Sequence, residues 1–295
     1  MTTSIRDTFV SRYGPDEGFL VEFDFTQLEI CALAEVANDT VLIEELNRGE
    51  DIHRLNAAMW LRKAPSAITT DERKRAKVMT FQLQYGARAP KMAASLGISE
   101  AEAQAFIDTF YDKYKGVAIY HFHLELIRKE KTASSKIQAD PSSEVWILNP
   151  TPTGRMYTIP FRQAENSKAW YYSSTEMKNY PIQGFGTADI VPIVINLVYD
   201  EVETLYNSLK EATKPLIINT VHDSIMFDCK AEELYRLFLC VESAFVKFPN
   251  KFKQLFDYEL KVRYNYDVKF GKNWSDKDMT KLSRNEVQSI VKEMV

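Results

Sequence analysis

The stretch GFLVEFDFTQLE, residues 18–29, places an aspartate at the end of an apolar strand. From Gly18 the side chains alternate, so that Phe23 and Phe25 point to one face of the strand and Asp24 points to the other. A second apolar run, LIINTVHDSIMF at residues 216–227, carries Asp223 in a turn between two predicted strands. If the two strands are neighbours in one sheet, their carboxylates form an oxygen site of the kind that binds divalent metal ions for phosphoryl transfer.

Each of these aspartates also has an ordinary structural explanation. Asp24 can simply end a strand, and Asp223 can simply form a turn, which is a common position for aspartate. For either residue taken alone the structural explanation is the more frequent one. The metal-binding interpretation therefore depends on a third segment.

That segment is a predicted helix between the two strands. Its start is marked by residues 69–72 and its end by Gly86. Four of its side chains follow one another at steps of four residues and share one surface: Arg73, Lys77, Phe81 and Tyr85. At ~1.5 Å per residue, Lys77 and Tyr85 are ~12 Å apart, about the length of a nucleotide from phosphates to base. The cations are suited to a triphosphate and the rings to a sugar and base. A helix with a solvated basic end and a buried aromatic end is the alternative, and in general it is more common.

Composition indicates a folded globular protein. The chain has 295 residues, of which 45% are hydrophobic and 12% aromatic, and its net charge of −4 does not by itself indicate a nucleic-acid partner. Three cysteines without paired spacing predict reduced thiols and no zinc site. No apolar stretch approaches the ~20 residues of a membrane span, and no signal-peptide layout is present. We therefore expect a cytoplasmic protein without a membrane partner.

The remaining pattern predicts an α+β fold, with strands from both ends of the chain beside a mainly helical middle. A capping box at Ser99–Glu102 begins a helix that Gly116 is expected to close, and an edge strand is expected at residues 258–268. The tail after Trp274 is charged, and we expect it to be loosely held. Further helices are predicted at residues 28–37, 51–60, 187–205 and 231–245, and hairpins at residues 145–160 and 216–227.

Other polar residues near these segments receive structural interpretations. Glu22 and Asp228 lie close to the acidic strands in sequence; they could support the site residues, but we expect ordinary surface charges. His121 and His123 are two residues apart on a predicted helix, where side chains point in different directions. We expect them to be structural residues and not metal ligands.

Taken together, these segments resemble DNA polymerase family A, the DNA polymerase I group, over nearly the whole chain. The resemblance rests on six motifs, whose wording is most similar to that of bacteriophage members. They are residues 24–29, the helix residues Arg73, Lys77, Phe81, Tyr85 and Gly86, His222-Asp223, residues 49–53 (GEDIH), residues 179–184 (NYPIQG) and residues 271–274 (GKNW).

The resemblance implies a right-hand polymerase fold. Residues 1–46 and 162–295 would form the palm, an antiparallel sheet with helices, and residues 47–161 the mainly helical fingers. Family members also carry a thumb and an exonuclease domain ahead of the first acidic motif, and this chain begins shortly before Asp24. We expect those domains to come from a separate polypeptide, as in a split polymerase; a fragment of a longer polymerase is the alternative.

The resemblance also implies a role for each site residue in template-directed DNA synthesis from deoxynucleoside triphosphates on primer-template DNA. Two Mg²⁺ ions, or Mn²⁺, would be held by Asp24, Asp223 and the carbonyl of Phe25. Glu29, in contact with Tyr85, would exclude a ribose 2′-hydroxyl. Lys77 is the further catalytic residue, the nucleotide would be bound by Gln27, Glu29, His53, Arg73, Lys77, Phe81 and Tyr85, and DNA would be bound by Asn179, Gln183 and His222.

Three positions differ from the usual family pattern. Ser224 stands where many members have glutamate, Cys31 where arginine is frequent, and Thr175 at a common DNA-contacting arginine position. Phe81, where some members have tyrosine, implies poor use of nucleotides that lack a 3′-hydroxyl. These differences concern turnover, primer binding and metal affinity, and both aspartates are retained.

Two other functions compete with the DNA polymerase interpretation. Single-subunit RNA polymerases share the His-Asp-Ser turn and the lysine and Tyr-Gly of the helix, but Glu29 argues against that class. A non-catalytic DNA-binding subunit with a polymerase-like fold is the second alternative. This alternative is disfavoured because an inactive site has no need for the residues that the chain retains: Asp24, Asp223, Arg73 and Lys77.

Overall fold

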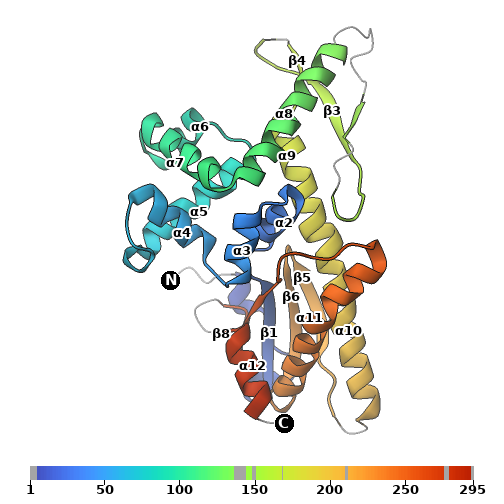
Figure 1. The fold of residues 1–295 in the computed structure, drawn as a ribbon. Helices are drawn as coiled ribbons and strands as arrows, with labels where there is room; N and C mark the ends of the chain where they lie inside the picture. Colours follow the sequence, from blue (N-terminus) through green and yellow to red (C-terminus); the bar gives the residue numbers. More distant parts are fainter. Residues whose placement is uncertain are drawn as a thin grey trace. The chain divides into compact units, whose positions relative to one another are not determined.

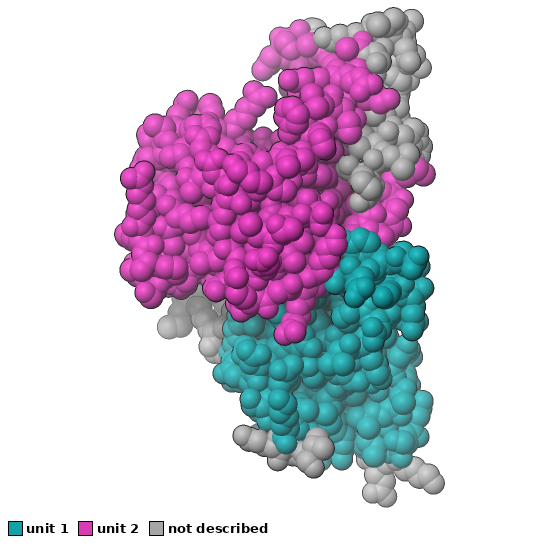
Figure 2. All heavy atoms as spheres, in the orientation of Figure 1, with its two compact units in different colours: residues 1–28, 186–260, 264–295 teal, residues 29–185, 261–263 magenta. Residues whose placement is uncertain are grey.

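The computed structural model describes residues 5–135, 144–147, 151–167, 169–209, 212–275 and 279–293. Two compact units make up the chain (Figure 2). The first, here the sheet unit, consists of residues 1–28, 186–260 and 264–295, and the second, here the helical unit, consists of residues 29–185 and 261–263. A sheet together with many helices confirms the predicted α+β class. The division into palm and fingers at residues 46 and 161 stays a prediction.

The sheet unit contains a five-stranded antiparallel sheet in the order β5-β6-β1-β7-β8 (Figure 1). β1 is the predicted strand, and it lies in the centre because both of its faces are covered by apolar side chains. The strands are β1 Gly18–Phe25, β5 Leu216–Val221, β6 Ser224–Lys230, β7 Tyr266–Gly271 and β8 Thr280–Ser283. The predicted hairpin of residues 216–227 is therefore confirmed as β5 and β6.

The aromatic face of this sheet is covered by α11, Leu234–Phe256. Phe23 of β1 meets Phe238 with ring centroids 6.0 Å apart, and Phe25 meets Phe245 at 5.2 Å. α10, Val191–Ser208, packs beside α11. The opposite face, to which Asp24 belongs, carries a separate apolar cluster built around Leu20, Met226 and Trp274. Short helical turns complete the unit: η1 Ile5–Thr8, α1 Gly14–Glu17 and η4 Ala231–Glu233, and the π-helix η3 Gly184–Ile190 lies across the boundary with the helical unit.

The helical unit contains most of the predicted middle of the chain. Its helices are α2 Leu28–Ala37, α3 Thr40–Asn47, α4 Ile52–Leu61, α5 Thr70–Gln84, α6 Ala89–Leu96, α7 Glu100–Lys113, α8 Lys115–Ser135 and α9 Ser174–Gln183, with the short turn η2 Pro65–Ala67. A three-stranded sheet of β2 Glu144–Ile147, β3 Tyr157–Gln163 and β4 Trp170–Tyr172 completes it, and β2 and β3 confirm the predicted hairpin. Capping boxes begin α5 and α7 at Thr69 and Ser99, as the sequence predicts.

Two local predictions are wrong. Gly116 does not close a helix: α7 ends at Lys113, and Gly116 lies in the first turn of α8. A glycine is needed there because a Cβ atom would lie 2.7 Å from the Cα of Asp39. The strand expected at residues 258–268 is confined to β7, and β7 is interior, since β8 pairs with its outer side.

The charged tail after Trp274 is also not loosely held where the structure describes it. It forms β8 and α12, Arg284–Glu293. Arg284 donates two hydrogen bonds to Glu242 of α11, at 2.8 and 2.9 Å, and Gln288 donates a third at 2.8 Å. A long-range ion pair therefore fixes a segment whose composition alone indicated a mobile tail.

One helical stretch, Ser174–Ser208, is long and apolar enough to cross a membrane by length and composition, with a mean hydropathy of 1.3 in its most apolar window. The expectation that no such stretch exists is therefore not met. Half of that window is buried inside the structure. Core helices of soluble proteins pass the same test, so the stretch is weak evidence for a membrane.

Candidate active site

In the sheet unit, Asp24 is surrounded by polar residues of both neighbouring strands. It lies opposite Ser224 of β6 on one side and opposite Asp267 of β7 on the other. Asp223 immediately precedes Ser224, and its carbonyl accepts a hydrogen bond of 3.3 Å from the Phe25 amide. The fold therefore brings together the two aspartates that the sequence pattern singled out.

The electrostatics of Asp24 reflect this crowding of acids. Burial first, and then the negative charges of Asp223 and Glu22, raise the pKa of Asp24 to about 6, while Lys269 acts in the opposite direction. A divalent cation between Asp24 and Asp223 would relieve this repulsion. Two carboxylates and a backbone carbonyl leave most coordination positions to water and phosphate, which is the usual protein environment of Mg²⁺. Among the described residues, no three Asp, Glu, His or Cys side chains gather to form a complete metal cage.

The turns next to these acids have unusual backbone conformations. His222, between β5 and β6, has φ of 56°, and Gln27, after β1, has φ of 55°, both in the left-handed region. Such conformations cost about 1 kcal/mol or more in non-glycine residues and are often found at functional sites. The Ser224 hydroxyl donates a hydrogen bond of 3.1 Å to the carbonyl of Val221. The Ser224 side chain therefore closes the turn.

In the helical unit, α5 carries Arg73, Lys77 and Phe81 along one side and ends at Tyr85, as the four-residue steps predict. The buried side of the helix consists of Ala76, Met79, Thr80, Leu83 and Gln84. On the other side Lys77 is exposed, and Arg73, Phe81 and Tyr85 are half-buried. The Lys77 ammonium lies 5.5 Å from the centroid of the Phe81 ring, and the His53 ring lies 5.7 Å from the same ring. The fold therefore brings Lys77, Phe81 and His53 together.

His53 is held neutral by its surroundings. It is 2% exposed, and burial followed by the charge of Lys77 lowers its pKa to about 4. Its Nδ1 atom has no hydrogen-bond partner among the described residues. A buried imidazole with a spare nitrogen beside two cations is suited to hydrogen-bond a phosphate without adding charge.

At the end of α5, the Tyr85 hydroxyl donates a hydrogen bond of 2.9 Å to Glu29. The side chain of Gln183 also hydrogen-bonds Tyr85, and burial together with Glu29 raises the pKa of Tyr85. Gln183 lies one helical turn after Asn179 on α9, and the exposed Thr175 lies one turn before it. The structure therefore gathers Glu29, Tyr85 and Gln183 at one point and aligns Asn179 with them on α9.

Two residues that contact the site residues were not predicted from the sequence. Asp51, at the start of the predicted helix, caps α4 through the Arg54 amide at 3.1 Å and also forms an ion pair with Arg73 that the sequence did not indicate. Lys178 of α9 is buried against the end of α5, and no sequence signal indicated this.

Two acids next to the site are buried, contrary to expectation. Glu22 is 7% exposed and Asp228 is 5% exposed, so neither is an ordinary surface charge. Asp228 accepts a hydrogen bond of 2.6 Å from Ser11 and pairs with Arg12, whereas Glu22 lies 3.7 Å from the Lys269 ammonium. Cys31 is buried as well, and burial raises its pKa to about 12, which makes it an unreactive core thiol.

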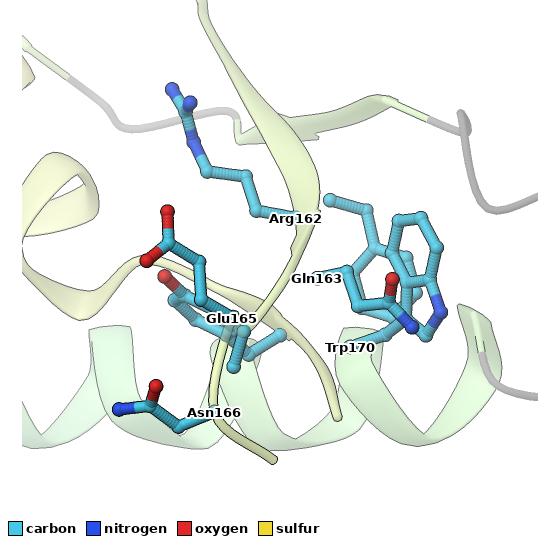
Figure 3. Close-up of a pocket in the computed structure, with 8 residues that line it drawn as sticks. Arg162, Gln163, Glu165, Asn166 and Trp170 are labelled. Carbon is cyan, nitrogen blue, oxygen red and sulfur yellow. The ribbon is translucent and has the colours of Figure 1, made fainter. Parts of the chain in front are cut away.

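A pocket in the helical unit is lined by residues 161–166 and 170–171, from β3, β4 and the segment between them (Figure 3). Its volume is about 670 Å³. Arg162, Glu165 and Asn166 extend to one side of the strand, and Gln163 and Trp170 to the other (Figure 3). None of the candidate site residues lines it, so this pocket is not the site described above.

Comparison with known proteins gives consistent results. The family model described as DNA polymerase family A matches residues 1–276. DNA polymerase I of Lactococcus lactis subsp. cremoris is 28% identical over 92% of this chain and 27% of its own length, and DNA polymerase theta of Mus musculus is 29% identical over 71% of this chain and 8% of its own length. Among solved structures, the POL domain of Pol1 from M. smegmatis in complex with DNA primer-template and dNTP aligns with a TM-score of 0.69 and 26% identity, covering 93% of this chain and 43% of that one. The chain thus spans less than a third of the length of these two curated relatives.

Proposed function

This chain belongs to DNA polymerase family A, and on that premise we propose that it adds deoxynucleotides to a primer 3′-hydroxyl as a template strand directs. The observation that carries the proposal is that Asp24, near the end of β1, lies opposite Ser224 of β6, which directly follows Asp223 in the β5–β6 turn. The solved relative in complex with primer-template and dNTP supports the choice of substrates.

We assign Asp24, Asp223 and the Phe25 carbonyl to the binding of two Mg²⁺ ions, for which Mn²⁺ can substitute. When bound, these ions neutralise charge on the reacting phosphates and activate the primer hydroxyl. The repulsion that raises the pKa of Asp24 supports a cation site at this position.

For the incoming nucleotide, we assign Arg73 and Lys77 to the triphosphate, with the neutral His53 as a hydrogen-bond partner. The bond from the α-phosphorus to the departing pyrophosphate breaks as the primer oxygen bonds to that phosphorus, and Lys77 is assigned to neutralise or protonate the pyrophosphate. Phe81 and Tyr85 would contact base and sugar. Glu29 and Gln27 are the remaining residues assigned to nucleotide binding.

For the DNA, we assign Asn179 and Gln183 of α9 and His222 of the β5–β6 turn to the primer end and the duplex minor groove. Asn179 and Gln183 lie one turn apart on the same side of α9, and His222 is exposed, which is consistent with this role. Thr175, which lacks the charge of arginine, would bind the DNA backbone less strongly.

The test is primer extension with magnesium by the parent and by Asp223→Ala, with Asp200→Ala as the control, because Asp200 is an exposed acid of the same unit. We expect Asp223→Ala to lose at least about a hundredfold in rate and Asp200→Ala to match the parent. Equal activity of parent and Asp223→Ala would refute the proposal and favour a non-catalytic DNA-binding subunit.

We further propose that the protein acts in the cytoplasm, and that a second polypeptide supplies the thumb and exonuclease portions of the relatives. A bacteriophage origin stays a prediction from the wording of the motifs.

A further inference from the structure

The last turn of α5 rests directly on a buried lysine of α9. Gly86 follows Tyr85 with φ of +76°, and a Cβ atom at Gly86 would lie 3.0 Å from Cδ and 3.2 Å from Nζ of Lys178. Ser174, one turn earlier on α9, would be 3.5 Å from the same atom through its hydroxyl. Lys178 is 7% exposed. The stem and ammonium of this side chain therefore form the surface against which the end of α5 packs.

A carboxylate of a third helix holds the ammonium in place. Lys178 Nζ lies 3.2 Å from Glu125 of α8. Glu125 also accepts hydrogen bonds from Arg128 at 2.8 Å and from Ser174. Although burial favours its neutral form, Ser174, Arg128 and Lys178 hold the pKa of Glu125 at about 2. Three helices, α5, α8 and α9, thus meet at one ion pair.

A buried lysine is a costly way to fill space. Removing a charge from water costs several kcal/mol, and a buried ion pair is often no more stabilising than apolar residues of equal volume. A methionine at position 178 would fill the same volume without a charge. The ammonium does offer directional contacts, since it lies at the C-terminal end of α5, where helix carbonyls carry partial negative charge.

The residue next to this contact selects the sugar in the proposed site. Tyr85 precedes Gly86, and its hydroxyl is held by Glu29 at 2.9 Å and by Gln183 of α9. α9 therefore supports the end of α5 at two adjacent residues: Gln183 at Tyr85 and Lys178 at Gly86. A shift of the last turn would change the Tyr85–Glu29 contact before any other part of the helix.

We propose that Lys178, held by Glu125, is a positioning residue that fixes the last turn of α5, so that Tyr85 and Glu29 discriminate between deoxyribose and ribose. Lys178 contacts no substrate in this scheme and acts through Tyr85. The inference rests on the proposed assignment of Tyr85 and Glu29 to the nucleotide sugar.

The test measures equilibrium binding and needs no catalysis. Dissociation constants for dATP and ATP with magnesium are determined by titration calorimetry for the parent and for Lys178→Met. The control is Lys129→Met, because Lys129 is an exposed lysine of α8 that lines a pocket together with Lys178, Glu125 and Gly86. We expect Lys178→Met to lose about tenfold in its preference for dATP over ATP, and Lys129→Met to keep the preference of the parent.

Several results would overturn the inference. An unchanged preference in folded Lys178→Met, or an equal loss of affinity for both nucleotides, would show a merely structural role. A parent protein that binds dATP and ATP equally, or that binds neither, would also overturn the inference. If Lys178→Met does not fold, Lys178→Met combined with Glu125→Gln removes the unpaired carboxylate, and the same criteria apply. Absence of primer extension with an intact dATP preference would refute the proposed function and leave this inference standing.

Discussion

Glu29 is the residue whose size should decide which sugar the site accepts. Its carboxylate accepts the Tyr85 hydrogen bond, so both its bulk and its position are held. Replacing Glu29 by alanine opens space beneath the proposed sugar position. We expect the ratio of ribonucleotide to deoxynucleotide incorporation to rise by about tenfold to a hundredfold.

Single-nucleotide extension with each nucleotide type measures that ratio. Glu44→Ala, which removes an exposed acid from α3 of the same unit, should leave it unchanged. An unaltered ratio in Glu29→Ala would remove Glu29 from sugar selection. A parent that prefers ribonucleotides would favour the single-subunit RNA polymerase class.

His121 should make the stability of the protein depend on pH. It is 4% exposed, its Nδ1 lies 2.8 Å from the Tyr111 hydroxyl, and burial, followed by the charge of Lys178 and against that of Glu125, lowers its pKa to about 3. The unfolded chain, with a pKa of about 6.5, then binds more protons than the native state between those values. The contribution of His121 is therefore fully present above pH ~6.5 and is lost as the pH falls.

The expected size follows from the same values. At pH 5 the loss is about 1.5 units times 1.36 kcal/mol, or about 2 kcal/mol. Urea denaturation at pH 7 and pH 5 should show a smaller pH dependence of the unfolding free energy in His121→Gln than in the parent. His53 contributes equally to the pH dependence of the unfolding free energy in both proteins. His123→Gln, at an exposed position of the same helix, should retain the slope of the parent, and identical slopes in His121→Gln and the parent would contradict the prediction.

Among the elements, α5 carries three of the seven residues proposed to bind the nucleotide, and its first turn depends on a reciprocal cap. The Glu72 amide donates to the Thr69 hydroxyl at 3.2 Å, and the Thr69 amide donates to the Glu72 carboxylate at 2.9 Å. Thr69→Ala should lower the unfolding free energy by about 1 kcal/mol, measured by urea denaturation. Thr70→Ala, one residue later and equally exposed, should change it by only a few tenths of a kcal/mol. Equal effects of the two changes would show that the cap is not important.

These elements also show which parts of the fold a sequence can predict. The bounds of α5 follow from Thr69, Glu72 and Gly86, because capping and a left-handed stop depend on neighbouring residues. Gly116 was misassigned, because its role is to allow close approach to Asp39, a contact distant in the sequence. The tail was misassigned for the same reason, since Arg284 is fixed by Glu242.

In the candidate site, too, local features could be predicted from the sequence, whereas contacts between distant residues could not. Asp24, Asp223 and the four-residue steps of α5 could be located because their residue types and spacing are local properties. The burial of Asp228 could not be predicted, because it depends on Ser11. The buried Lys178 could not be predicted either, because Glu125 lies on another helix.

For the molecule as a whole, the proposed function predicts weak and short-lived binding to DNA by this chain alone. Its net charge is −4, so the electrostatic attraction between the chain as a whole and the DNA backbone is weak. With excess unlabelled primer-template added as a trap at the start of the reaction, most extended primers should gain only a few nucleotides, and fewer at 200 mM than at 50 mM salt. The control adds the trap before the protein and should give no extension. A polypeptide carrying the proposed thumb and exonuclease portions should lengthen the products and elute together with this chain. Long products from a single binding event without it would contradict the need for a partner, because a surface with few phosphate contacts cannot retain the duplex through many additions.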